Sequence, residues 1–321
     1  MSDATGIPSA EIAQKRRSRL AAFFIRLVKE KPLGTASGII ILIWILIAIF
    51  ADALTPYPPF EMNLADRLQG SSARHLLGTD HIGRDVLSRL ILGARTSILI
   101  GLAATALSTV IGTLIGGTSG FLGGKFDIVV QRVVDAWIVF PGLLLLLTIM
   151  SIVGRGIPQI ILVLGISGGI GGSRLIRSAV IAIKGSDNFL AAEAVGNTKW
   201  RSLIRHVLPN VMPVVIITFS ITVGGVILSI ASLSFLGYGL PPTTPDWGGL
   251  LSREGRQYME QAPWLAVWPG LCLTIAVYCL NMLGDAIRDL LDPRLRGGEG
   301  RYGATGKRKR GLLSRLLNPF S

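Results

Sequence analysis

The chain has 321 residues, of which 50% are apolar and only 16% are charged. A soluble domain carries nearer a quarter charged residues, so this composition argues against an ordinary soluble protein and favours one membrane domain with polar tails. The net charge of +13 could suggest nucleic acid, but the basic residues follow a membrane topology, so no nucleic acid is expected.

The first apolar run predicts a transmembrane helix at residues 32–53, after a basic N-terminal tail at residues 1–31. The run ends in Ala51-Asp52-Ala53, which resembles a signal-peptide cleavage site. The leader and the apolar run are both longer than in most signal peptides, so an uncleaved helix is favoured. A polar segment, residues 54–95, follows and is expected outside the cell.

Residues 96–287 are predicted to form a core of five further helices. Uncharged runs mark them at residues 96–124, 136–154 and 156–173, from residue 207 onward, and at 261–284. A polar loop at residues 183–210 separates the fourth helix of the chain from the fifth. Residues 288–321 form a basic C-terminal tail. The fold class is therefore an all-α integral membrane protein of about six transmembrane helices.

Six crossings place both termini on the same side of the membrane. With the tails and the even-numbered loops inside, the inner side holds a roughly threefold excess of the Lys and Arg residues, which assigns both termini to the cytoplasm. The cluster Lys307–Arg310 in the C-terminal tail is expected to contact anionic lipid headgroups.

Small residues recur at four-residue spacing within the apolar runs. Such pairs allow two helix backbones to approach closely in lipid, so we expect tight helix packing there. The pairs are Gly112 and Gly116, Gly165 and Gly169, and Gly168 and Gly172.

No catalytic or metal site is predicted. Cys272 and Cys279 share a helix face but lie too far apart for a disulfide, and His75, His81 and His206 show no metal-ligand spacing. Charged residues are nearly absent from the apolar runs. Arg132 and Asp135, near the start of the third predicted helix, are three residues apart and can pair.

The polar loop has the pattern of two short helices rather than of a disordered linker. Asp187 can cap a first helix through Val195, and Gly196 supplies its C-terminal stop. Asn197 or Thr198 can cap a second helix, Lys199–Val207, which ends before Pro209. The sequence therefore predicts a helix–Gly–helix elbow.

The second helix of the elbow carries an apolar stripe. Trp200, Leu203, Ile204 and Val207 lie at i, i+3, i+4 and i+7, apart from the basic residues. Such an elbow can dock into a groove of another protein, or it can lie on the bilayer surface. The spacing alone leaves both interpretations open.

The loop resembles the "EAA" loop of binding-protein-dependent ABC importer permeases. In that family the pattern is Glu-Ala-Ala, three residues, Gly, nine residues and Ile-x-Leu-Pro. Ala191, Ala192, Gly196 and Leu208-Pro209 match it at the right spacing, whereas Leu190 stands at the Glu position. Glu193 lies one helical turn further on, and its replacement of the missing carboxylate is left open.

Other segments extend the resemblance to the "C"-type permeases of dipeptide, oligopeptide and nickel importers. Each segment alone can be ordinary turn or cap chemistry, but the five occur in the family's order. They are His75–Leu90, Arg205–Asn210, Ser232–Gly239, Pro245–Gly248 and Asn281–Arg296.

The resemblance implies a type I ABC importer permease-like bundle in a bacterial or archaeal inner membrane. It also implies a second homologous permease, two ATPase subunits, an extracytoplasmic solute-binding protein and contact with membrane lipids. The ATPase-coupling residues would be Leu190, Ala191, Ala192, Glu193, Gly196, Trp200, Leu208 and Pro209. The candidates for docking the binding protein are Asp80, Arg84, Asp85, Asp246 and Trp247.

The chain itself contains no Gly-x-x-x-x-Gly-Lys-[Ser/Thr] phosphate loop. We therefore expect a transport subunit and not an enzyme, with no cofactor of its own, and ATP and Mg²⁺ used by a partner ATPase. Alternatives are a secondary carrier, which usually has buried ionisable groups in its spans, and a channel, which needs a filter. Peptides or similar small molecules are the expected solutes, but the sequence does not identify which.

Overall fold

The computed structural model describes residues 19–58 and 60–291, and over these residues it is helical without a β-strand. This confirms the predicted all-α fold. The predictions for residues 1–18 and for 292–321, including the Lys307–Arg310 cluster, lie outside the described residues.

Five helices are long and apolar enough to cross a membrane. They are α2 (Pro32–Ile49), α4 (Val86–Leu122), α7 (Ile157–Lys184), α10 (Leu208–Phe235) and α12 (Trp264–Leu291). Large apolar side chains such as Leu33 and Leu114 stand exposed on the outside of the bundle. Such a surface suits lipid rather than water.

The predicted third span, Ala136–Gly154, is wrong as a single straight helix. The chain forms α5 (Gly124–Val139) and α6 (Gly142–Val153), which meet at an angle of 90°. Pro141 causes the break, because proline lacks an N–H donor and holds the preceding Phe140 in an extended conformation. Taken as one broken span, the pair brings the number of candidate spans in the described chain to six.

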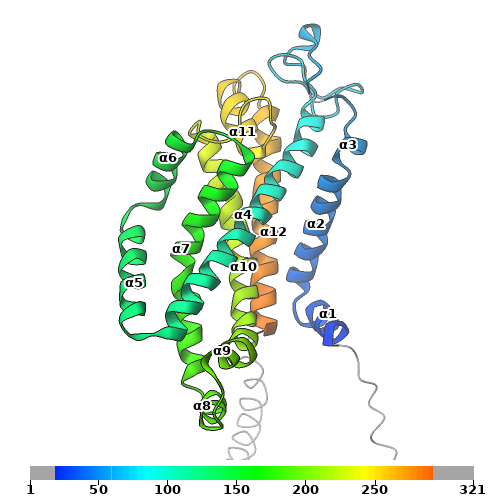
Figure 1. Ribbon diagram of the computed structural model, residues 1–321. Coiled ribbons are helices and arrows are strands. Elements are labelled where there is room, and N and C mark those ends of the chain that lie inside the picture. Colours follow the sequence, from blue (N-terminus) through cyan, green and yellow to red (C-terminus); the bar gives the residue numbers. More distant parts are fainter. Residues whose placement is uncertain (1–18, 59, 292–321) are drawn as a thin grey trace, which may run out of the picture.

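Short elements lie at the two ends of the bundle (Figure 1). The end that carries α8 and α9, here called the hairpin end, also holds α1 and the last turn of α12, so both described ends of the chain lie there. The opposite end, here called the α11 end, holds the loop before α4. The short elements are α1 (Arg19–Glu30), α3 (Ala51–Leu54), η2 (Leu64–Asp66), α8 (Asp187–Ala194), α9 (Lys199–Ser202), η3 (Leu203–Val207), α11 (Trp247–Leu250) and η4 (Leu251–Gly255).

The most extensive helix contact in the bundle joins α4 to α7, and glycines make it possible. A Cβ on Gly112 would lie 3.2 Å from the carbonyl oxygen of Gly169, and one on Gly116 would overlap the carbonyl oxygen of Ser173. Gly165 and Gly169 are equally crowded by α4. The predicted packing role is confirmed for these two pairs, whereas a Cβ on Gly172 would touch nothing.

Two spans are longer than their uncharged runs. Helix α4 begins at Val86 rather than at residue 96 and includes Arg89 and Arg95, so the polar segment before it is shorter than predicted. Helix α7 continues past Ser173 to Lys184, and its Arg177 pairs with Asp127 of α5. Charges with partners do not interrupt a helix, which is why the uncharged runs ended too early.

Candidate functional site

The predicted elbow at residues 183–210 is present as a hairpin of short helices. Helix α8 is followed by Gly196, whose φ of +87° is in the left-handed region that glycine adopts without strain. Thr198 caps α9, since its hydroxyl oxygen accepts a hydrogen bond from the Arg201 N–H at 3.4 Å. The predicted Asp187 cap is wrong by one residue: α8 begins at Asp187 itself, and the Leu190 N–H donates to the Ser186 carbonyl at 3.1 Å.

The second helix of the hairpin runs into α10 through a widened turn. At η3 the Leu208 N–H donates to the Leu203 carbonyl five residues earlier, which makes a π-helical turn. Pro209 follows at once and cannot donate to the carbonyl four residues before it. The Asn210 side chain instead donates to the His206 carbonyl at 2.6 Å. Helix α9, η3 and α10 follow one another without a break from Lys199 to Phe235 and are here called the rod.

A buried apolar cluster fixes the hairpin to the bundle. Phe189 of α8 is only 2% exposed and packs with buried residues of α4, α7, η3 and α10. These are Phe121, Ile176, Val180, Val207 and Val211. Burying a Phe side chain contributes about 2–3 kcal/mol, so α8 is held firmly against the ends of α7 and α10.

The opposite side of α8 presents apolar side chains to the outside. Leu190 is 52% exposed and Ala191 is exposed beside it, and Val195, in the turn directly after α8, is 87% exposed. Ala192 is partly buried, and the side chain of Glu193 lies outside the described part of the structure. The structure therefore leaves open, as the sequence did, whether Glu193 replaces the missing carboxylate.

The apolar stripe of the second helix is divided between the core and the surface. Val207 is buried, and Leu203 packs on the same cluster as Phe189. Trp200 is 69% and Ile204 is 49% exposed. Leu208 and Pro209, the last coupling candidates, are exposed at the start of α10.

At the α11 end, two arginines and two carboxylates form a buried network. Asp80 accepts from Arg84 Nε and from Arg89 Nη1, each at 2.6 Å. Glu254 of η4 accepts from Arg84 Nη2 at 2.9 Å and from Arg89 Nη1 at 2.7 Å. All four residues are buried. The network ties the loop before α4 to η4, which lies more than 160 residues later in the chain.

The five predicted docking residues are buried, so their side chains do not form an exposed docking surface, and the prediction needs correction. Asp80 and Arg84 belong to the network, and Asp85 caps α4 by accepting from the Ser88 N–H at 2.8 Å. Asp246 caps α11 by accepting from the Gly249 N–H at 2.8 Å. The Trp247 indole is fully buried and donates to the Leu90 carbonyl at 3.1 Å.

The pKa values of Asp80 and Asp246 shift in opposite directions. Burial raises the pKa of Asp80, but the charges of Arg89 and Arg84 and two backbone N–H donors outweigh it, so the net shift is downward. Burial of Asp246 prevails over its hydrogen bonds and raises its pKa. Because the Asp80 pKa is lowered, its stabilisation is present above the ordinary carboxyl pKa and is lost as the pH falls through the folded value.

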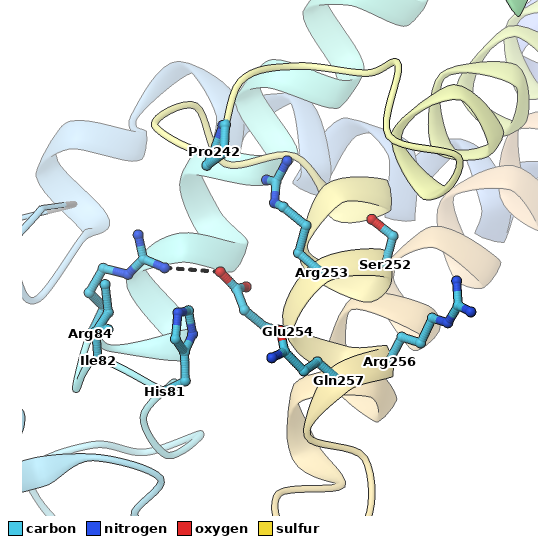
Figure 2. A pocket seen from close by; sticks show the side chains of 9 residues that line it. All are labelled: His81, Ile82, Arg84, Pro242, Ser252, Arg253, Glu254, Arg256 and Gln257. Atoms are coloured by element: carbon cyan, nitrogen blue, oxygen red, sulfur yellow. Dashed lines mark hydrogen bonds and ion pairs between the residues drawn. The ribbon is translucent and has the colours of Figure 1, made fainter.

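A cavity of ≈ 700 Å³ lies beside the network, between the loop that carries His81 and the η4 segment (Figure 2). Asp80, His81 and Glu254 offer donor atoms within 4.8 Å of one another, as a metal site would. Both Asp80 oxygens, however, already accept two hydrogen bonds each, and two guanidinium groups repel a cation. These residues therefore do not suit a metal ion.

Replacing Arg89 with glutamine is expected to destabilise the chain by about 3 kcal/mol, because Asp80 and Glu254 would remain buried with one positive partner fewer. The matched control is Arg95→Gln on the same helix. Its ion pair with Asp52 is solvent-exposed, so it should cost under about 1 kcal/mol. Unfolding in denaturing detergent measures the loss of stability in both variants. Equal losses would show that the buried network contributes no more than an exposed ion pair.

The described structure is thus a helical bundle with several candidate membrane spans and a packed helical hairpin at one end. The family model "Binding-protein-dependent transport system inner membrane component" matches residues 108–297, and "N-terminal TM domain of oligopeptide transport permease C" matches residues 18–70. The chain belongs to this family of permeases and is of the C type found in peptide ABC importers.

Curated relatives cover most of the chain. The dipeptide transport system permease protein DppC of Alkalihalophilus pseudofirmus is 37% identical over 84% of this chain and 88% of its own length. The glutathione transport system permease protein GsiD of Pectobacterium atrosepticum is 35% identical over 85% and 91%. A solved structure of the MetNI methionine ABC transporter in an inward-facing conformation gives a TM-score of 0.49 at 20% identity, over 64% of this chain and 96% of that one.

Proposed function

We propose that the chain is one of two pore subunits of an ATP-driven importer and that α8 is its contact with a separate ATPase. The observation that carries the proposal is the hairpin. Leu190 and Ala191 of α8, with Val195 in the turn directly after it, form an exposed apolar face, and Phe189 anchors the other side of the helix. A rigid, exposed, apolar helix at a polar end of a membrane bundle suits docking into a groove of another protein.

The anchoring suggests how ATP hydrolysis would drive the pore. Phe189 packs on α7 and α10, and η3 joins α9 to α10 without a gap. Closure of an ATPase pair on ATP and Mg²⁺ would push α8 as a rigid body, and α7 and α10 would tilt with it. The two spans would then open the pathway first to one side of the membrane and then to the other.

The partners and the orientation are part of the proposal. We place the hairpin and both termini in the cytoplasm, where the basic residues concentrate and where ATP is available. Two ATPase subunits, a second homologous permease and an external solute-binding protein complete the transporter. The binding protein would dock on exposed residues of the α11 end, such as Leu64, Leu76 and Met259, with the buried network holding the loop beneath them.

The proposed solutes are peptides or similar small molecules, because the curated relatives are named as dipeptide and glutathione permeases. The binding protein would select among them. No catalytic step is assigned to this chain.

Reconstitution tests the function. Vesicles that contain this chain, its second permease and the ATPase should take up a dipeptide or glutathione only when ATP, Mg²⁺ and the binding protein are all supplied. Omission of the ATPase should reduce uptake to the level of empty vesicles. Full uptake without the ATPase, or uptake that follows an ion gradient instead, would contradict the proposal.

A further inference from the structure

An apolar groove runs along the outside of the hairpin end. Its volume is ≈ 210 Å³, and its walls come from α4, α7 and the α9–η3–α10 rod. Leu114 and Gly117 of α4 line one side, and Trp200, Ile204 and Leu208 line the other. The Thr118 hydroxyl, also in the wall, donates back to the Leu114 carbonyl at 2.6 Å. An apolar chain would fit this groove better than a polar ligand.

The groove lies where the chain enters the membrane. Helices α9, η3 and α10 run on as one candidate span from Lys199 to Phe235, with its three charged residues in the first turns and an apolar run after them. Trp200 stands 69% exposed at the first turn of that span. Tryptophan is enriched at the level of the lipid headgroups, where its ring is in hydrocarbon and its N–H is in a polar layer. The groove therefore lies at the polar end of this span.

Three basic residues are neighbours in sequence of Trp200 and Ile204, which line the groove. Lys199, Arg201 and Arg205 are exposed and alternate with Trp200 and Ile204 along the rod. Among the carboxylates whose side chains the structure describes, which leave out Glu193, none pairs with these three residues, whereas Arg174 and Arg177 of α7 each pair with an aspartate. A group of three exposed positive charges attracts an anionic headgroup at about 1 kcal/mol per residue.

We propose that this groove binds one molecule of an anionic phospholipid. One acyl chain lies in the groove against Ile204 and Leu208, and the phosphate is held by Lys199, Arg201 and Arg205. The apolar walls and the nearby charges together favour a lipid over a protein helix, because an apolar groove lies beside exposed cationic groups at the polar end of a span. The site divides the hairpin: α8 faces the ATPase, and the α9–η3 stripe faces the membrane.

The site goes beyond ATPase coupling, since α8 can dock with or without lipid in the groove. A lipid bound there would also couple the bilayer to the movement of the hairpin. The lipid would contact α4 and the hairpin rod at once, so a tilt of the rod against α4 would change the width of the groove. Anionic lipid would therefore stabilise one position of the hairpin over the other.

Quenching of tryptophan fluorescence by brominated lipid tests whether a lipid occupies the groove. The full chain is placed in phosphatidylcholine vesicles that contain a small fraction of phosphatidylglycerol with a dibrominated acyl chain. The fluorescence of Trp200 is obtained as the difference between the fluorescence of the wild type and that of the Trp200→Phe variant, which lacks one of the six tryptophans. We expect an apparent affinity for brominated phosphatidylglycerol about tenfold above that for brominated phosphatidylcholine. Equal affinities would overturn the proposal.

Two variants separate the groove from the three nearby charges. A triple variant that removes the three charges should abolish the preference for phosphatidylglycerol: Lys199→Gln, Arg201→Gln and Arg205→Gln together. The control triple variant removes as much exposed charge elsewhere and should leave the preference unchanged: Lys29→Gln, Lys125→Gln and Arg132→Gln together. Gly117→Leu fills the groove without a backbone clash and should reduce Trp200 quenching by both lipids; Gly225→Leu, equally free of contacts, should not.

The assembled transporter supplies the last comparison. Trp200 quenching should persist when the chain is purified together with the second permease and the ATPase. Loss of quenching on assembly would show that a protein surface covers the groove, and the lipid site would be refuted. Unchanged quenching in the Gly117→Leu chain would refute it as well, because the acyl chain would then lie elsewhere.

Discussion

Ala191→Arg is expected to reduce ATP-driven uptake by about tenfold or more while the chain remains folded and inserted. Ala191 is exposed on the outer face of α8, between Leu190 and Val195, so an arginine there meets no part of the bundle. In a complex, the same side chain would have to enter the groove of the ATPase, where it would clash and lose its hydration. Uptake in vesicles, corrected for the amount of inserted chain, measures the effect.

The control is Ala53→Arg, the same substitution at an exposed position of α3 at the other end of the bundle. It should leave uptake within about twofold of the wild type, since surface substitutions rarely perturb a fold. Gly196→Pro is a second test of the hairpin, because proline cannot adopt the φ of +87° at the turn between α8 and α9. Normal uptake in both hairpin variants would exclude a coupling role for α8.

Gly116→Ala is expected to separate α4 from α7 and to destabilise the bundle by about 3 kcal/mol. The added Cβ would overlap the Ser173 carbonyl oxygen and would lie 2.9 Å from the Arg177 nitrogen, and both are backbone atoms of a long helix. Neither can move without a shift of α7. Resistance to unfolding in denaturing detergent measures the loss.

Gly117→Ala is the matched control, one residue further along α4. Its Cβ would touch nothing within 4 Å, and alanine is favoured over glycine inside a helix by about 1 kcal/mol. The two neighbouring substitutions should therefore change stability in opposite directions. A similar loss in both would mean that α4 and α7 do not pack through Gly116.

The hairpin could be predicted from the sequence because its signals are local. Gly196 marked the turn, Thr198 was one of the two caps considered, and Pro209 marked the change to α10. The anchor Phe189 was not singled out, although it lies between a cap and the two alanines. Its role depends on Val180 and Val211, which come from other helices, so no pattern within the loop could show it.

The α11 end was harder to predict because its contacts are long-range. Arg89 and Glu254 were not among the candidates, and each would have been expected to face water. The bond between them joins residues 165 positions apart, and that pairing makes burial of Asp80 and Arg84 possible. The same cause explains why the docking candidates were predicted to be exposed. Charged residues in turn motifs are expected to face water unless their long-range partners are known.

The break at Pro141 was also missed, although proline was visible in the run. An uncharged run of residues 136–154 has the length of a span, and hydropathy alone does not distinguish a straight helix from a bent pair. Proline imposes an extended conformation on the preceding Phe140, and this conformation makes the pair bent rather than straight.

Site-specific cross-linking tests the central claim, that α8 binds an ATPase on the cytoplasmic side, most directly. Cys272 and Cys279 are first replaced by serine, and one cysteine is then placed at Ala191 or, as the control, at Ala53. The Ala191 position should form an adduct with the ATPase and should resist an impermeant thiol reagent added outside intact cells, while Ala53 should react from outside and form no adduct. Labelling of the Ala191 position from the external medium, or no adduct with the ATPase in the assembled transporter, would contradict the account.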